Sequence, residues 1–413
     1  MTDWWGVDGG ITAPKGYRAA GIAAGLKPSG AKDLALIVSD VDAIAAGVFT
    51  ITQVRAACVD YCRQKLDAHP SARAILCNAG QANAGTGEQG WDDACESATL
   101  TAQYLGIPED SVLVASTGVI GERIHMEEMR AGIPKLVASA SVENGAEATQ
   151  AILTTDLVPK FISLETNLNG RPVRIGGISK GSGMIHPNMA TMLAFVTCDA
   201  TVSPSLWQQM LSRAADKSFN QITVDGDTST NDSLIALANG ESRTPAITEA
   251  GAEADRLEAM LTEVCIHLAK AIARDGEGAT CLIEVQVIGT VDDASARRIA
   301  RTIAGSSLVK AAVFGRDPNW GRIAAAAGRA GVVFDMANLG VRLGDIALME
   351  RGQPLQFDRG AASQYLKNAS EGEYLKTDTV VIAVSVGQGP GSGTAWGCDL
   401  SYDYVRINAE YTT

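Results

Sequence analysis

The sequence predicts a layered α/β fold divided into two subdomains, and three observations support this prediction. Short apolar runs alternate with helical patterns through roughly the first 130 residues, which is typical of strands and helices arranged in layers. Farther along the chain, apolar and polar residues alternate with a period of two, as in strands that are buried on one face. The chain has 413 residues, more than a single hydrophobic core usually spans.

The amino-terminal part supplies strands and helices in turn. We expect strands where apolar residues run together, at Leu34–Val38, Ala74–Cys77 and Val112–Ala115. Helical patterns separate these runs, at Gln53–Leu66 and Asp92–Leu105. The chain continues with two further helical patterns and a strand-like stretch, at 126–137, 142–153 and Arg174–Lys180.

A buried strand at Thr191–Cys198 opens the second part of the chain. Helices are expected next, at 204–217 and 252–274. Apolar residues in the second helix recur at spacings of three and four, which lines one helical face, at Leu257, Leu261, Val264, Leu268 and Ile272. The glycines of Gly276–Gly278 end this helix.

The carboxyl-terminal part is rich in strand patterns. The alternation over Cys281–Ile288 suits an antiparallel sheet with helices on one side, and similar patterns recur near 379–386 and 400–411. The glycine-rich stretch Gly387–Gly393 follows one of these strands, but a phosphate-binding loop needs a helix directly behind it. Because the next segment alternates like a strand, we expect these glycines to form a hairpin connection.

Composition narrows the classes of partner and cofactor. With 34 Lys and Arg against 47 Asp and Glu, the net charge is −13, which would repel a nucleic-acid backbone. No apolar run has the length of a membrane span, and the first residues lack a signal-peptide pattern, so we expect a cytoplasmic protein that binds no membrane. Cys58 and Cys62 lie four residues apart, but no second Cys or His pair follows at metal-site spacing, so no metal is expected.

The stretch from Lys180 to Val196 contains the most informative chemistry. A glycine-bounded loop delivers Thr191 to the first position of an apolar strand, where a rigid element can hold its hydroxyl. Taken alone, Thr191 is more simply a β-branched strand residue. If the bond before it were cut, however, the new α-amine would become a general base within reach of the hydroxyl, so that one cleavage creates both nucleophile and base.

The segment Lys180–Leu193 closely resembles the processing site of the ornithine acetyltransferase family of arginine biosynthesis. Seven other stretches match this family in order along nearly the whole chain, at Gly10–Tyr17, Asn78–Asn83, Ser116–Gly121, Thr154–Asp156, Val224–Asp232, Gly276–Gly278 and Ile407–Thr413. Eight ordered motifs of this length are not expected by chance. The resemblance therefore changes the interpretation of Thr191 from strand residue to nucleophile.

The resemblance implies that the chain cuts itself between Ala190 and Thr191. The products would be an α chain, residues 1–190, and a β chain, residues 191–413, paired in an α2β2 assembly. It implies an α-β-β-α-like sandwich similar to that of N-terminal nucleophile enzymes, with a second, smaller α/β subdomain. The implied reaction moves acetyl from N2-acetylornithine to glutamate through an acetyl ester of Thr191, without a cofactor. Acetyl-CoA is a possible second donor, since some family members accept it.

The resemblance also assigns residues to the site. Thr117 and Gly118 match the oxyanion hole, where a hydroxyl and a backbone N–H suit a tetrahedral oxyanion. The alternative for Ser-Thr-Gly is a turn that follows the strand Val112–Ala115. Six positions match substrate-binding residues of the family, namely Thr154, Lys180, Thr191, Glu277, Asn408 and Thr413.

Two of these residues suggest specific partners. Lys180 is a reasonable partner for the α-carboxylate of either amino acid, and Glu277 for the δ-ammonium of ornithine. The alternatives are a solvated charge at Lys180 and a helix-end side chain at Glu277. His186 lies five residues before Thr191, but we expect a loop residue there, because the α-amine already supplies the base.

Two other classes of protein are compatible with these sequence features. A self-cleaving aminopeptidase or amidohydrolase would use the same nucleophile but pass the acyl group to water. Acetate release without glutamate would identify it. A non-catalytic binding protein would remain one uncut chain on a denaturing gel.

Overall fold

The computed structural model describes residues 3–186 and 192–410 of the chain. These residues form two compact units, each built from several stretches of sequence. The first unit takes the chain up to Gly181, the stretch that ends at Asn220, and Thr228–Leu268. The second takes Ser182–His186, Gln221–Asp227 and everything from Ala269 onward. Each unit contains one sheet with its own helices, which confirms the layered α/β class and the smaller second α/β part.

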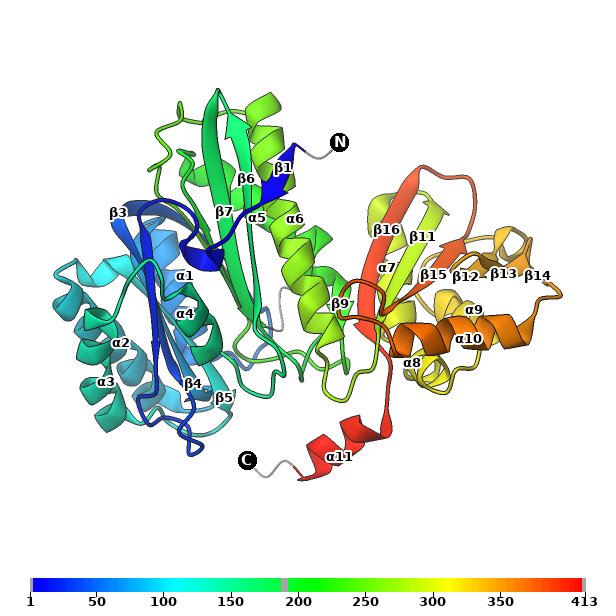
Figure 1. Ribbon diagram of the computed structural model, residues 1–413, viewed down its shortest axis with the longest axis horizontal. Helices are drawn as coiled ribbons and strands as arrows, with labels where there is room; N and C mark the ends of the chain where they lie inside the picture. Colours follow the sequence, from blue (N-terminus) through cyan, green and yellow to red (C-terminus); the bar gives the residue numbers. More distant parts are fainter. Residues whose placement is uncertain (1–2, 187–191, 411–413) are drawn as a thin grey trace. The chain divides into compact units, whose positions relative to one another are not determined.

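The first unit is built on a nine-stranded mixed sheet with the order β1-β6-β7-β8-β10-β3-β4-β5, in which β2 pairs with β3 (Figure 1). Its strands are β1 Trp4–Gly6, β2 Tyr17–Ile22, β3 Leu34–Phe49, β4 Ser71–Gln81, β5 Val112–Val119, β6 Lys160–Leu168, β7 Arg171–Lys180, β8 Leu193–Cys198 and β10 Ser233–Ala238. The predicted strands at 34–38, 74–77, 112–115 and 174–180 are all confirmed within longer ones. The strand predicted from Thr191 is described from Leu193 onward.

Helices cover this sheet. They are α1 Ala57–Ala68, α2 Gly87–Leu105, α3 Met126–Ala138, α4 Gly145–Ala151, α5 Pro204–Lys217 and α6 Ala252–Arg274. Trp207 of α5 donates from Nε1 to the carbonyl of Ala236 in β10, at 3.1 Å. The predicted apolar face of α6 is fully buried, and its Val264 and Leu268 side chains lie where Gly177 of β7 has no side chain. The periodicity of α6 therefore identified its packing face correctly.

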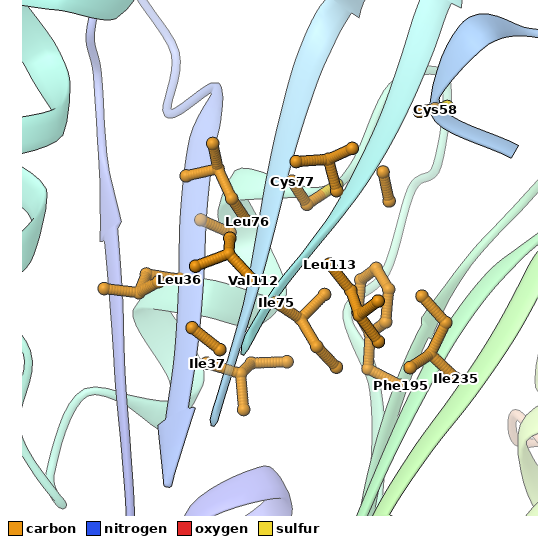
Figure 2. Close-up of a cluster of buried hydrophobic side chains, with 14 of the residues drawn as sticks. Leu36, Ile37, Cys58, Ile75, Leu76, Cys77, Val112, Leu113, Phe195 and Ile235 are labelled. Carbon is orange, nitrogen blue, oxygen red and sulfur yellow. The ribbon is translucent and has the colours of Figure 1, made fainter. Parts of the chain in front are cut away.

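One buried cluster joins five strands of the sheet in the first unit. It includes Leu36 of β3, Ile75 of β4, Leu113 of β5, Phe195 of β8 and Ile235 of β10, each at most 1% exposed. Figure 2 shows these side chains projecting from the faces of their strands. Burial of each such side chain contributes about 1.5–3 kcal/mol. The strand that follows position 191 is thus anchored in the main core.

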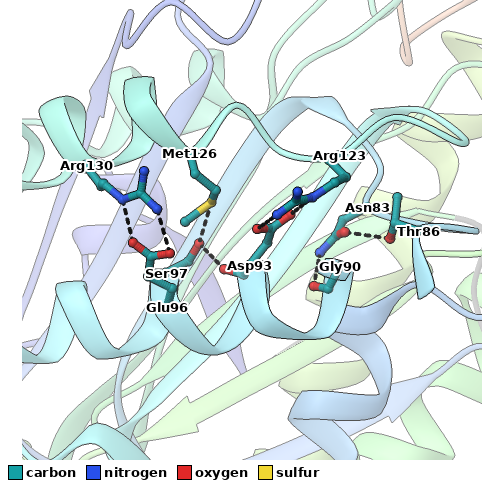
Figure 3. Close-up of polar contacts among 9 residues, drawn as sticks. All are labelled: Asn83, Thr86, Gly90, Asp93, Glu96, Ser97, Arg123, Met126 and Arg130. Carbon is teal, nitrogen blue, oxygen red and sulfur yellow. Dashed lines mark hydrogen bonds and ion pairs between the residues drawn. The ribbon is translucent and has the colours of Figure 1, made fainter. Parts of the chain in front are cut away.

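Polar contacts connect α2 with α3 and with the loops after β4 and β5 (Figure 3). Arg123 makes two hydrogen bonds to the buried carboxylate of Asp93, at 2.7 and 3.0 Å. Arg130 makes a similar pair to Glu96 at the surface. Asn83, the last residue of the motif Asn78–Asn83, has a positive φ of 53° and donates to the carbonyl of Gly90 at 2.8 Å.

The second unit is built on a seven-stranded sheet with the order β14-β13-β12-β15-β11-β16-β9. Its strands are β9 Ile222–Thr223, β11 Leu282–Thr290, β12 Gly340–Leu343, β13 Ile346–Glu350, β14 Gln353–Pro354, β15 Thr379–Ser385 and β16 Gly391–Cys398. Its helices after α6 are α7 Asp293–Ala304, α8 Ser307–Phe314, α9 Trp320–Gly328, α10 Arg359–Ser370 and α11 Tyr402–Glu410. Ile283, Val285 and Val287 of β11 join buried side chains of α7 in one cluster, so one face of this sheet is covered by helices as predicted.

Three expectations for the second unit are wrong. The sheet is mixed, because β11 pairs parallel with β15 and antiparallel with β16. Since β11 lies between β15 and β16, the glycine-rich stretch that begins at Gly387 crosses β11 before it enters β16 at Gly391, and it is not a hairpin. A Cβ on Gly389 would lie 2.0 Å from the carbonyl oxygen of Thr290, so glycine lets the loop cross the end of β11.

The third error is the strand expected near 400–411, because Tyr402–Glu410 form helix α11 instead. The Ser401 hydroxyl accepts a hydrogen bond from the Asp403 N–H at 3.2 Å, as a helix-starting serine does. No side chain of α11 is buried. The apolar alternation there therefore had no sheet to pack against.

Candidate active site

The predicted nucleophile Thr191, the cleavage bond after Ala190 and the substrate residue Thr413 lie outside the described residues. The chain is described again from Met192, whose carbonyl accepts a hydrogen bond from the Ser233 N–H at 3.0 Å. Leu193 then pairs with Lys180 of β7 on one side and with Ser233 of β10 on the other. The strand directly after position 191 is therefore held by two neighbours.

Thr117 and Gly118 lie within β5, and not in a turn after it. Gly118 has φ +131°, and a Cβ there would lie 2.2 Å from backbone atoms of Gly80 in the paired strand β4. Only glycine fits a position with both this conformation and this close approach. Because β5 is the last strand of the sheet, half of its backbone N–H groups face away from the ladder.

Lys180, at the end of β7, reaches the buried side chain of Thr117 and donates a hydrogen bond to its Oγ1 at 2.9 Å. Burial lowers the pKa of Lys180, while the negative charge of Asp156 raises it. The structure thus brings together Thr117 and Lys180, which the sequence placed in different roles.

Asp156 connects several parts of this region. Its Oδ1 accepts hydrogen bonds from Lys160 Nζ at 2.6 Å and from the Gly181 N–H at 2.7 Å. Its Oδ2 accepts the N–H of Thr154, a predicted substrate residue, at 3.0 Å. The side chains of Asp156 and Lys160 are both 0% exposed. Burial raises the pKa of Asp156, but Lys160 and Lys180 outweigh it and lower the pKa to about 2.

Asn231 fixes β5 from another side. Its Nδ2 donates to the carbonyl of Ser116 at 2.8 Å and to that of Ala82 at 2.6 Å. A buried amide with these bonds holds the backbone just before Thr117. The sequence alone indicated no role for Asp156, Lys160 or Asn231. The available signal was that Asp156 and Asn231 lie inside the matched motifs Thr154–Asp156 and Val224–Asp232.

Glu277 and Asn408 are brought together in the second unit. The Asn408 Nδ2 donates to Glu277 Oε2 at 2.8 Å, so α11 meets the motif Gly276–Gly278 through two predicted substrate residues. A Cβ on Gly183 would lie 2.5 Å from the Glu277 carboxyl carbon, so the carboxylate rests against a glycine. Thr154, Lys180 and Thr117 belong to the first unit, whereas Glu277 and Asn408 belong to the second.

The loop before the undescribed segment is held by Asp225. Its carboxylate accepts the N–H groups of Met184 at 2.6 Å and Ile185 at 2.9 Å, and burial raises the pKa of Asp225. His186 lies in the same loop, with Nδ1 2.9 Å from Thr223 Oγ1. Burial lowers the pKa of His186 to about 4, with Arg301 adding to the effect. His186 is therefore a neutral loop residue at pH 7.

The chain as a whole is also similar to known proteins. The family model described as "ArgJ family" matches residues 18–413. The chain belongs to the ArgJ family. Among its ArgJ relatives, the "arginine biosynthesis bifunctional protein ArgJ" of Synechocystis sp. is 72% identical over the full length of both chains. A chloroplastic ArgJ protein of the moss Physcomitrium patens is 56% identical over 99% of this chain and 79% of its own.

One solved ArgJ structure is similar as well. The crystal structure of the arginine biosynthesis bifunctional protein ArgJ of Bacillus halodurans is 43% identical, with a TM-score of 0.50. The match covers 52% of this chain and 98% of the solved one. The solved chain is therefore about half as long as the present chain. None of the described helices combines the length and apolarity of a membrane span.

Proposed function

We propose that this ArgJ-family chain is a self-cleaving acetyltransferase of arginine biosynthesis. It moves acetyl from N2-acetylornithine to glutamate through an ester on Thr191. The observation that carries the proposal is the position of Lys180, which pairs with Leu193 and also donates to Thr117. This arrangement connects the candidate oxyanion donors to the strand that begins two residues after Thr191.

The reaction proceeds in two transfers. The α-amine of Thr191 removes the hydroxyl proton as Oγ1 attacks the acetyl carbonyl, and the Thr117 hydroxyl and Gly118 N–H stabilise the oxyanion. The C–N bond of acetylornithine breaks, and the amine leaves with the proton. The amine of glutamate then attacks the acetyl-threonine ester and restores the free hydroxyl. The acetyl group passes between two amines, so the scheme needs no cofactor.

Glu277 and Lys180 serve recognition in this scheme. The Glu277 carboxylate, held by Asn408, pairs with the δ-ammonium of ornithine. Lys180 keeps further N–H groups besides the one donated to Thr117, and these can bind an α-carboxylate. Because relatives are named bifunctional, we include acetyl-CoA as a second acetyl donor to glutamate.

Self-cleavage would leave an α chain of residues 1–190 and a β chain of residues 191–413, assembled as α2β2. The half-length chain of the Bacillus halodurans relative supports this part of the proposal, because cleavage near the middle would leave such a chain. Both fragments contribute strands to the nine-stranded sheet, since β8 and β10 lie between β7 and β3. The two fragments would therefore stay together after the cut.

The proposal is tested with wild-type protein, Thr191→Ala and Thr191→Ser. We expect two bands on a denaturing gel for the wild type, the larger with Thr191 as its first residue, and glutamate-dependent loss of acetylornithine. Thr191→Ala should remain uncut and inactive, whereas Thr191→Ser, which keeps a hydroxyl, should retain part of both activities. Acetate release that does not depend on glutamate would favour a hydrolase instead. An uncut wild-type chain with full activity would disprove the scheme.

A further inference from the structure

The direction of the hydrogen bond between Lys180 and Thr117 has a consequence for the oxyanion hole. A lysine ammonium has three N–H donors and no acceptor, so Thr117 Oγ1 must be the acceptor of the 2.9 Å bond. The hydrogen of the Thr117 hydroxyl is then available for another acceptor. If Lys180 were a neutral amine, it could accept that hydrogen itself and turn the hydroxyl donor away. The charge of Lys180 therefore decides where Thr117 donates.

Neighbouring charged groups act on the pKa of Lys180 in both directions. Burial and the charge of Lys160 lower its pKa, whereas Asp156, Cys77 and Asp232 act in the opposite direction. Lys27 is also near, and the charge of Lys180 lowers the pKa of Lys27. Among these groups, Asp156 is the largest influence that favours the charged form of Lys180.

Asp156 also fixes the position of Lys180. Its Oδ1 accepts the N–H of Gly181, the next residue, at 2.7 Å. Its side chain is fully buried and is itself held by Lys160 and the Thr154 N–H. A rigid carboxylate that holds the neighbouring backbone keeps the lysine at the end of β7 aimed at Thr117.

We propose that Asp156 is a positioning residue for acetyl transfer: it keeps Lys180 charged and in place, so that the Thr117 hydroxyl donates to the developing oxyanion. A hydroxyl that accepts from a cation is also polarised toward donation. This inference rests on the proposed function. It assigns Lys180 a second role beside the binding of an α-carboxylate.

The test is a double-mutant cycle between Asp156→Asn and Thr117→Val, followed by single-turnover transfer of labelled acetyl from acetylornithine to the cleaved protein. Loss of one oxyanion donor lowers the rate by about 10²–10³-fold, so we expect a fall of this size for Thr117→Val and a fall of roughly tenfold or more for Asp156→Asn. Because Asp156 acts through Thr117, adding Asp156→Asn to Thr117→Val should cost less than about threefold. The KM for acetylornithine should change less than the rate in Asp156→Asn.

The pH profile separates this role from a purely structural one. The α-amine of Thr191 must be neutral to act as a base, so it controls the acidic limb, and the charge of Lys180 controls the alkaline limb. Asp156→Asn removes the charge that raises the pKa of Lys180, so the alkaline limb should move to lower pH. Lys180→Arg, which keeps its charge throughout, should remove the dependence of that limb on Asp156.

Asp199→Asn is the matched control. Asp199 is also a buried carboxylate of the first unit that holds two backbone N–H groups, those of Arg174 at 2.8 Å and Lys15 at 3.1 Å. Asp199→Asn should leave the alkaline limb of the pH profile unmoved. Its effect on the rate of acetyl transfer should be the same with and without Thr117→Val. If Asp156→Asn does not fold, Lys180→Met provides the same cycle with Thr117→Val.

The inference is overturned if Asp156→Asn lowers the rate equally in both backgrounds and leaves the alkaline limb unmoved. The same holds if Lys180→Met, used in its place, is fully additive with Thr117→Val. Rates are expressed per cleaved chain, as measured on a denaturing gel, so that an effect on processing is not counted as an effect on transfer. A wild-type protein that forms no acetyl-enzyme would instead disprove the proposed function.

Discussion

The two units position their candidate site residues in different ways. In the first unit, Thr117 is buried in a strand and Gly118 lies against the backbone of Gly80, so that backbone contacts set their positions. In the second unit, the contact between Glu277 and Asn408 joins a half-buried carboxylate to an exposed amide, and no backbone group takes part in it. Oxyanion stabilisation needs donors at fixed positions, whereas binding of a substrate ammonium tolerates some side-chain adjustment. The comparison predicts that changes in the first unit reduce stability and turnover, and that changes in the second mainly weaken binding.

The largest effect is expected for Gly118→Ala. The new Cβ would meet backbone atoms of Gly80 at 2.2 Å at a φ of +131°, and neither strand can move without disturbing the sheet. We expect a loss of about 2–5 kcal/mol in unfolding free energy, from strain and overpacking together. Guanidinium denaturation followed by circular dichroism measures it, with exposed Gly170→Ala as the control for a positive φ without a clash. Equal losses for both variants would show that the contact with Gly80 is unimportant.

Acid stability should reveal the buried pair of Asp156 and Lys160. Because its folded pKa of about 2 lies below the ordinary value of 3.8, the charged form of Asp156 stabilises the protein above pH 4. This contribution, on the order of 2 kcal/mol, should disappear as the pH falls from about 4 to about 2. The unfolding free energies of wild type and Asp156→Asn should therefore converge over this range. A constant difference would mean that Asp156 does not titrate with a lowered pKa.

Gly183→Ala provides the counterpart to Gly118→Ala in the second unit. Its Cβ would meet the end of the Glu277 side chain at 2.5 Å, and that side chain can rotate away. We expect little change in stability but a roughly tenfold rise in the KM for acetylornithine, as a misplaced carboxylate costs about 1.4 kcal/mol of binding. Steady-state kinetics on the cleaved protein test this. A large fall in kcat with unchanged KM would place Glu277 in the chemical step instead.

The smallest effect is expected for Asn408→Ala. The substitution removes the 2.8 Å hydrogen bond to Glu277, but the bond is exposed and water can replace it. The KM for acetylornithine should rise by about threefold or less, near the lower end of a hydrogen bond's net contribution. Asn368→Ala, on α10, is a control away from Glu277. An effect larger than that of Gly183→Ala would mean that Asn408 contacts the substrate directly.

The sequence predicted local elements better than it predicted their partners. Helices α5 and α6 were predicted residue for residue, because Pro204 at the first turn and the apolar spacing of α6 act locally. The segment 400–411 was predicted as a strand, but Tyr402–Glu410 within it form a helix, because the alternation there was not tied to any neighbouring strand. The stretch Gly387–Gly393 was expected to join adjacent strands, but β11 lies between them. Strand order depends on contacts across the whole sheet, which no local pattern records.

For the candidate site, too, the sequence indicated the residues but not the contacts between them. The sequence and its resemblance to ornithine acetyltransferases named Thr117, Gly118, Lys180, Glu277 and Asn408, since motifs record which chemical groups are present. They did not indicate that Lys180 donates to Thr117, 63 residues away, or that Asp156 holds the backbone of Gly181, 25 residues away.

By itself, therefore, the sequence determined the α/β class, the family and the groups available for acetyl transfer. Only the tertiary structure decided which carboxylate lies near which lysine, and thus which charges act on the pKa of Lys180. The physical reason is that a pKa depends on burial and on the charges within a few ångströms, and folding sets both by bringing distant segments together.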